Sequence, residues 1–265
     1  MTHCTKSQTA MLSLLALLPL AAGCAATGPV GGDVSPAAQA RQLVLVVSDD
    51  WDATTATLQC YARADTGAKW QRVGQAAPAN IGRTGLAWGR GLHGQPALSG
   101  VEGLPGPVKR EGDGKAPAGA FALPSAFGYA AQEDAGGIRL PYIPLTSNVV
   151  GVDDVKSKRY NQIVRLDQVT KDWDSFETMR RDDGLYEWGV VVNHNTTPVQ
   201  PGAGSCIFLH VWRGPGKPTA GCTAMSRDDL LAVMKWLDPR CRPVLVQLPR
   251  AAYDRLAKPW GLPGR

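Results

Sequence analysis

The stretch Cys206-Ile207-Phe208-Leu209-His210-Val211-Trp212, followed after a short loop by Thr219-Ala220-Gly221-Cys222-Thr223, carries most of the information in this chain of 265 residues. The first segment is an apolar run of the kind that forms a β-strand, with a histidine near its end. The second segment places a cysteine twelve positions after that histidine, in a glycine turn. Together they predict a strand and a turn that bring an imidazole beside a thiol.

A thiol becomes a good nucleophile only when it loses its proton, so a catalytic cysteine needs an adjacent base and an electropositive pocket. Cys222 is the candidate nucleophile and His210 the candidate general base. The amides around Gly221 and Thr223 are candidate donors to an oxyanion, and Arg213 would favour a thiolate. From spacing alone, a buried cysteine and a strand histidine that never meet is an equally good interpretation.

The rest of the chain reads as short strands with few helices. Apolar positions at helical spacing predict helices over 169–183 and 226–238, the second with Ser226 as its N-cap. Strand-like runs are expected at 42–48, 58–64, 70–73, 119–123, 188–194, 206–212 and 243–248. This order predicts a mainly β or α+β architecture in a single domain.

The first residues look like an export signal. Residues 1–23 contain Lys6 and an apolar run that suits a signal peptide and is short for a membrane span. The run ends in Leu20-Ala21-Ala22-Gly23-Cys24, which resembles a bacterial lipobox, so we expect Cys24 to be acylated; ordinary signal cleavage is the alternative. Residues 24–40 are rich in Gly, Ala and Pro and predict a flexible linker, which leaves 41–265 as the catalytic domain.

Charge and cysteine content argue against a nucleic-acid-binding protein, a disulfide-rich scaffold and a metal site. The net charge of +5 falls to +4 without residues 1–23, which remove Lys6 and no acid, and the interspersed charges do not favour nucleic acid as a partner. Six cysteines are too few for a disulfide scaffold, although Cys206 and Cys241 both begin strand-like runs and are a candidate disulfide. Two buried small side chains are the alternative. Neither CxxC nor HExxH occurs, so no metal is expected.

Three segments resemble one family. His210 with Thr219-Ala220-Gly221-Cys222-Thr223 is similar to the signature of the L,D-transpeptidases (YkuD-like domain), which has a histidine, a variable loop and Ser/Thr-His-Gly-Cys. Residues 109–121 resemble its Gly-Asp-Gly-Lys-Thr-Pro-x-Gly-x-Phe segment, and residues 82–86 resemble the preceding strand and turn. Ala220 in place of the motif histidine, and Thr223-Ala224-Met225 after the cysteine, mark a divergent branch.

The resemblance implies a YkuD-like β-sandwich with a few short peripheral helices, acting without a cofactor on peptidoglycan stem peptides in the periplasm. Cys222 would form a thioester with a donor stem, with His210 as base, and an amine of a second stem would resolve it. An L,D-carboxypeptidase or amidase using the same thioester, or a non-catalytic peptidoglycan-binding lipoprotein, are alternatives. A lipid on Cys24 would tether the domain to a membrane, and Ala25 favours the outer over the inner one.

The altered motif requires substrate contacts from other residues. His194-Asn195, at the end of a predicted strand, is the first candidate, although a strand-end turn explains it equally. Acidic and amide groups near 151–161 could hold an amine, although aspartates more often cap turns. The full set of candidate contacts is His194, Asn195, Arg213, Thr219, Tyr160 and Asp154. Trp88, Trp188 and Trp212 could stack on glycan, but tryptophans in strands are more often core.

Overall fold

The computed structural model describes residues 35–94, 100–101 and 104–264. The expected signal peptide (1–23), Cys24 and residues 25–34 of the expected linker lie outside the described residues. The described residues form one compact unit. Within the described ranges, the search for a helix long and apolar enough to cross a bilayer found none.

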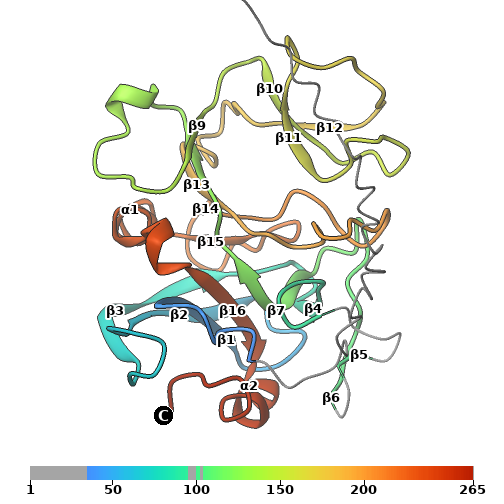
Figure 1. Ribbon diagram of the computed structural model, residues 1–265. Helices are drawn as coiled ribbons and strands as arrows, with labels where there is room; N and C mark the ends of the chain where they lie inside the picture. Colours follow the sequence, from blue (N-terminus) through green and yellow to red (C-terminus); the bar gives the residue numbers. More distant parts are fainter. Residues whose placement is uncertain (1–34, 95–99, 102–103, 265) are drawn as a thin grey trace, which may run out of the picture. The chain divides into compact units, whose positions relative to one another are not determined.

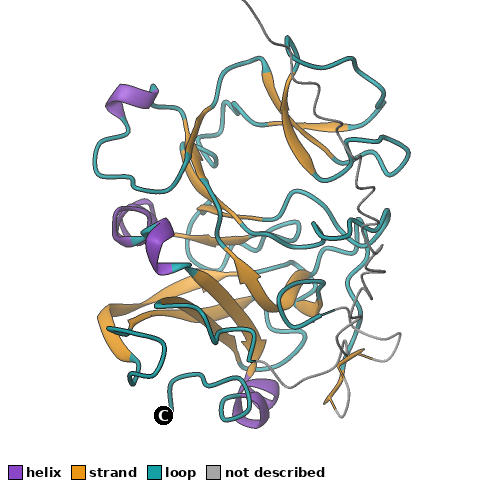
Figure 2. Cartoon of the chain, viewed as in Figure 1, coloured by secondary structure: helices purple, strands orange, loops and turns teal. Residues whose placement is uncertain are grey.

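A mixed sheet of eleven strands dominates this unit, in the order β4-β7-β16-β1-β2-β3-β15-β14-β13-β8-β9 (Figures 1 and 2). The mainly β fold with short peripheral helices is therefore confirmed. The strands are β1 Gln42–Ser48, β2 Thr55–Ala62, β3 Gln71–Asn80, β4 Leu86–Trp88, β7 Ala116–Ala122, β8 Ala126–Gly128, β9 Tyr142–Pro144, β13 Trp188–Val191, β14 Phe208–Val211, β15 Thr223–Met225 and β16 Val244–Pro249. A separate pair consists of β5 Gly100–Val101 and β6 Leu104–Pro105.

The core is densest around β1, all seven residues of which are buried. β1 pairs in parallel with β16 and antiparallel with β2, so neither of its edges is free. A strand that is covered on both faces needs no polar alternation, which is why this run reads as continuously apolar. The helix α2 (Arg250–Leu256) follows β16 and packs against β16 and β1.

The part of the sheet that carries the candidate site is β13-β14-β15, backed by the helix α1 (Arg227–Trp236). The hydroxyl of Ser226 accepts a hydrogen bond from the amide of Asp229 at 3.1 Å, as predicted for the N-cap. Leu230, Val233 and Met234 are the buried face of α1. β14 and β15 run parallel, joined by the loop 212–222. This crossover brings His210 and Cys222 together.

A small sheet of β10 (Val149–Val152), β11 (Gln162–Arg165) and β12 (Phe176–Thr178) lies beyond β13 (Figure 1). The helix predicted over 169–183 is wrong, because β12 pairs with β10 in the middle of that range. Trp173 and Met179 are buried, but Phe176 is exposed, so their helical spacing reflects no helical face. The only other helical segments among the described residues are the short 3-10 turns Gln132–Asp134 and Pro239–Cys241.

The described end of the expected linker, residues 35–40, is packed rather than flexible. Ala37 and Ala40 are buried in the main core. The guanidinium of Arg63 donates to the carbonyls of Ala37 and Ala38, each at 2.8 Å, and of Ala40 at 2.7 Å. The composition missed this because small residues such as alanine suit a tight packing site as well as a linker.

Candidate active site

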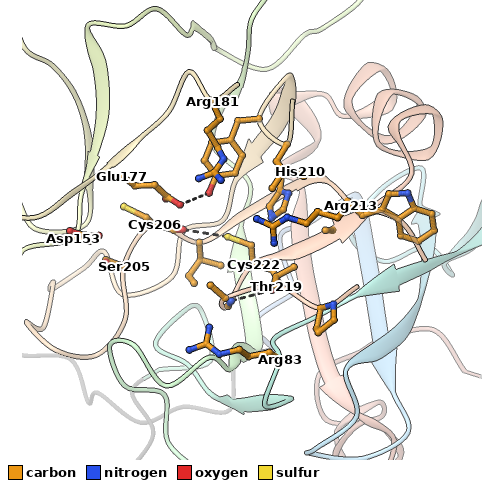
Figure 3. Close-up of a pocket in the computed structure, with 18 of the residues that line it drawn as sticks. Arg83, Asp153, Glu177, Arg181, Ser205, Cys206, His210, Arg213, Thr219 and Cys222 are labelled. Carbon is orange, nitrogen blue, oxygen red and sulfur yellow. Dashed lines mark hydrogen bonds between the residues drawn. The ribbon is translucent and has the colours of Figure 1, made fainter. Parts of the chain in front are cut away.

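Cys222 and His210 lie on one face of the sheet, at the parallel pair β14-β15. In the register His210 is opposite Ala224, and Cys222 is two residues before Ala224, so the three side chains share a face. Both functional side chains point into the same pocket (Figure 3). The Cys222 sulfur accepts a hydrogen bond from the amide of Phe208 at 3.3 Å and donates to the carbonyl of Cys206 at 3.5 Å. The small side chain of Ala224 leaves space beside the imidazole.

One hydrogen bond orients the imidazole of His210. Its Nδ1 lies 2.7 Å from the carbonyl oxygen of Val211, which fixes Nδ1 as the protonated nitrogen. Its Nε2 has no hydrogen-bond partner among the described residues. In this tautomer Nε2 is the basic nitrogen, and it is available to take a proton within the pocket.

A threonine hydroxyl shapes the turn before the cysteine. Thr219 Oγ1 donates to the carbonyl of Cys222 at 2.6 Å and accepts from the amide of Gly221 at 3.1 Å. A Cβ at Gly221 would stand 3.1 Å from the carbonyl oxygen of Lys115, so the turn fits closely against the 109–115 segment. Because the Gly221 amide is bonded to Thr219, the structure does not direct it at an oxyanion.

Burial keeps the resting pair neutral. Burial, and after it the nearby Glu177 carboxylate, raise the pKa of the Cys222 thiol to about 12. Burial likewise lowers the pKa of His210 to about 4, against its hydrogen bond to Val211. A thiol and a neutral imidazole are therefore the ground state. The proton transfer from sulfur to nitrogen must be coupled to attack on a substrate.

The surrounding pocket has a volume of about 340 Å³ and carries charges of both signs. Arg213 and Thr219, predicted from the sequence, line it, together with Trp212. The 109–115 segment forms part of its wall, with Asp113 accepting from Lys109 Nζ at 2.6 Å. The charged residues that line the pocket are Arg83, Lys109, Arg181, Arg213, Lys217, Glu111, Asp153 and Glu177.

One wall was not anticipated from the sequence. Glu177 on β12 and Tyr186 before β13 both line the pocket, and the Tyr186 hydroxyl donates to Glu177 Oε1 at 2.7 Å. The Tyr186 ring meets the His210 ring edge-on, with centroids 5.3 Å apart. Glu177 comes from the range that was interpreted as a helix. Only the alternation of β12, with Glu177 half-buried between exposed neighbours, could have indicated its inward direction.

His194 and Asn195 are not brought to the pocket. His194 is buried, with Nδ1 accepting from the Arg90 amide at 3.3 Å and Nε2 donating to the Ala203 carbonyl at 2.9 Å. The Asn195 amide donates to the carbonyls of Gln200 and Gly204, each at 2.9 Å. Both residues therefore hold the 195–204 loop. The strand-end turn, which was the alternative interpretation, describes them correctly.

Three further candidates also lie outside the pocket lining. Tyr160 is buried and donates to the Glu111 carboxylate. Asp154 caps turns, accepting from the amides of Lys156 at 2.9 Å and Asp174 at 2.7 Å. Thr223 is buried and donates to the side chain of Gln247 at 2.6 Å.

Of the three candidate tryptophans, two pack in or against the core and one borders the pocket. Trp88 is fully buried, with its indole N–H donating to the carbonyl of Leu104 at 3.0 Å. Trp188 packs against the main core. Only Trp212 of the three borders the pocket, so it alone is placed to meet a substrate.

The predicted disulfide between Cys206 and Cys241 is not formed. All four described cysteines, Cys60, Cys206, Cys222 and Cys241, are free thiols. Cys206 precedes β14 and Cys241 precedes β16, and β1, β2, β3 and β15 separate these strands in the sheet. The similar sequence positions of the two cysteines, each before a strand, therefore say nothing about their distance in space.

No group of three or more His, Cys, Asp or Glu side chains within the described ranges is arranged to hold a metal ion. The site offers instead the chemistry of a thiol, an imidazole and a mixed-charge pocket.

The geometry agrees with a comparison with known families. A family model described as the L,D-transpeptidase catalytic domain (YkuD) matches residues 69–246, a range that includes β14, β15 and the whole pocket wall. No curated protein sequence matches the chain significantly. The match covers well over half of the chain, and we conclude that the chain belongs to the L,D-transpeptidase catalytic domain (YkuD) family, whose substrates are peptidoglycan stem peptides.

Proposed function

We propose that this protein is a cysteine-dependent L,D-transpeptidase that forms cross-links between peptidoglycan stem peptides. The observation that carries the proposal is that His210 on β14 and Cys222, directly before the parallel neighbour strand β15, line one pocket. A free Nε2 on His210 supplies the base that a thiol with a raised pKa requires.

In the first half-reaction, Cys222 Sγ attacks a carbonyl of the donor stem while His210 Nε2 takes the thiol proton. The tetrahedral intermediate collapses, its C–N bond breaks, and the leaving amine takes that proton from His210. A thioester remains. In the second half-reaction, an amine of the acceptor stem attacks the thioester, loses a proton to His210, and the thiol re-forms with that proton.

The charges of the pocket suit a substrate that carries several carboxylates and an amine. Arg83 and Arg213 present cations, and Glu177 and Asp153 present carboxylates (Figure 3). Lys217 also lines the pocket. Ala220 stands where the family pattern has a histidine, and it is exposed at the pocket edge. This edge is open to a larger substrate group than a histidine would admit.

The decisive experiment incubates the purified protein with tetrapeptide and tripeptide muropeptides and identifies the products by mass spectrometry. Dimers that are absent with Cys222→Ala are the expected result. If only shortened monomers form, the protein is a carboxypeptidase or amidase and not a transpeptidase. Sequencing the linkage of a dimer shows whether the donor is the usual L,D bond or the stem's L-alanine. Full activity of Cys222→Ala would refute the mechanism.

We also propose that residues 1–23 are a signal peptide and that Cys24 is acylated, which anchors the domain to the periplasmic face of the outer membrane. The lipobox-like sequence before Cys24 supports this proposal. Metabolic labelling with a fatty acid should mark the wild type and not Cys24→Ser. Equal labelling of both would leave ordinary signal cleavage as the explanation of the export signal.

A further inference from the structure

The contact between His210 and Tyr186 is the only aromatic contact that the imidazole makes among the described residues. The two rings are close to perpendicular, at 73°. The Tyr186 ring is itself enclosed, meeting Phe127 and Phe208 edge-on with centroids 5.7 and 5.6 Å away. A ring with partners on several sides has little freedom, so it forms a fixed wall against the imidazole.

The hydroxyl end of Tyr186 is held by the carboxylate of Glu177, which forms no ion pair within the described part of the chain. Its one hydrogen-bond partner among those residues is the Tyr186 hydroxyl at 2.7 Å. Arg181, whose charge lowers the pKa of Glu177 and whose guanidinium lies over the Tyr186 ring, donates to Asp183 at 2.9 and 2.6 Å. Burial raises the pKa of Glu177, which reflects the cost of this placement. A carboxylate buried without an ion pair destabilises the fold, and such groups are found mainly where they have a role in a functional site.

We propose that Glu177 and Tyr186 form a positioning pair that holds the His210 imidazole toward Cys222, so that the small sheet contributes to the catalytic geometry. The Val211 carbonyl fixes one ring nitrogen, and the Tyr186 ring blocks rotation of the imidazole out of the pocket. The inference rests on the proposed roles of His210 and Cys222. It adds to them two positioning residues that act through His210.

The pair Tyr160–Glu111 provides a matched control. It is also a buried tyrosine that donates to a carboxylate beside the pocket, but its ring has no contact with the imidazole. Tyr160→Phe and Tyr186→Phe both remove a hydroxyl–carboxylate hydrogen bond, and Tyr160→Phe also removes the bond from the Gly204 amide at 3.2 Å. Only Tyr186→Phe acts on His210.

The test measures the rate at which iodoacetamide alkylates Cys222 in the full chain at neutral pH, resolved from the other cysteines by peptide mass spectrometry. This readout needs no muropeptide. His210→Ala gives the rate without the base. Tyr186→Phe is expected to lower the rate about five- to tenfold, the effect of one lost hydrogen bond, and Tyr160→Phe to leave it unchanged.

Two variants at Glu177 separate the hydrogen bond from the charge. Glu177→Gln and Glu177→Leu both remove the negative charge near the thiol, but only glutamine still accepts from the Tyr186 hydroxyl. Glu177→Gln should therefore react several-fold faster than Glu177→Leu. In muropeptide assays the same variants should lower kcat with little change in KM.

The outcomes distinguish failure of the proposed base from failure of the positioning pair. If His210→Ala reacts as fast as the wild type, the proposed base is wrong. If His210→Ala is slow but Tyr186→Phe equals the wild type, or if the two Glu177 variants react equally, the positioning pair is wrong and the proposed function stands.

Discussion

His210 lies on β14 and His194 lies just after the neighbouring strand β13, and the chain uses them in opposite ways. Both are buried, and burial lowers the pKa of His210 to about 4 and of His194 to about 3. Both ring nitrogens of His194 form hydrogen bonds with backbone groups. Only one ring nitrogen of His210 does so, and the other faces the pocket. Because the two histidines are similarly buried and have similarly lowered pKa values, they differ mainly in whether one ring nitrogen is left without a hydrogen bond. That nitrogen is what makes His210 a candidate base.

The largest expected effect is on catalysis at His210. His210→Ala should lower kcat/KM for muropeptides by about a thousandfold, because general base catalysis contributes on that order. The melting temperature should change little, since the side chain borders a pocket. Product rates and thermal melts measure both. An active His210→Ala would end the contrast between the two histidines.

The next effect concerns acid. His210, His194 and His93 all have pKa values lowered from 6.5, so the unfolded chain binds more protons than the native state below that pH. Their stabilisation is complete above pH 6.5 and is lost as pH falls toward 4, at roughly 3 kcal/mol for each histidine. Denaturant titrations at pH 7 and pH 4.5 measure this. In His210→Ala and His194→Leu the pH dependence should weaken by similar amounts.

A smaller loss is expected at neutral pH from His194→Leu. Leucine leaves the Arg90 amide and the Ala203 carbonyl without the imidazole, at a cost of about 2 kcal/mol. The activity of the molecules that remain folded should match the wild type. The midpoint of denaturant unfolding reports the first effect and kcat the second. A large drop in kcat with unchanged stability would show that His194 acts in the active site and not only in the loop.

The smallest effect is on the turn before the nucleophile. Thr219→Val keeps the shape of the side chain but loses its bonds to the Cys222 carbonyl and the Gly221 amide. We expect kcat/KM to fall about tenfold, with a stability loss of about 1 kcal/mol. Thr178→Val, at an exposed threonine on β12, is the matched control and should change neither. Equal behaviour of the two variants would mean that the turn holds its shape without the hydroxyl.

The parts of the fold predicted correctly are those with local signals. The apolar run of β1, the capped helix α1 and the strand-like run that contains β14 have strong patterns, whereas β15 was not predicted as a strand. The floor of the site, His210 and Cys222, follows from the family signature. Arg213 and Thr219 lie close to it in the chain and also line the pocket, and their contact with a substrate stays a prediction.

The pocket wall could not be predicted in the same way. Glu177 and Tyr186 carry no motif, and their roles arise from the pairing of β12 with β10, which only long-range contacts reveal. The spacing of Trp173, Phe176 and Met179 imitated a helix because two of the three are buried for unrelated reasons. His194 looked functional because a sequence shows that a histidine ends a strand, but not what its nitrogens contact.

The loop from His210 to Cys222 is tied at its tip. The side-chain amide of Asn80, at the end of β3, donates to the carbonyls of Gly214 and Lys217 at 2.8 and 2.9 Å, and its oxygen accepts from the amide of Gly216 at 3.0 Å. The distance between base and nucleophile is thus set by the β14-β15 ladder and this anchor, and the number of residues in between is incidental. A search pattern for relatives should therefore leave that spacing open, and protein engineers can treat the loop tip as an insertion point only if the asparagine contacts are kept.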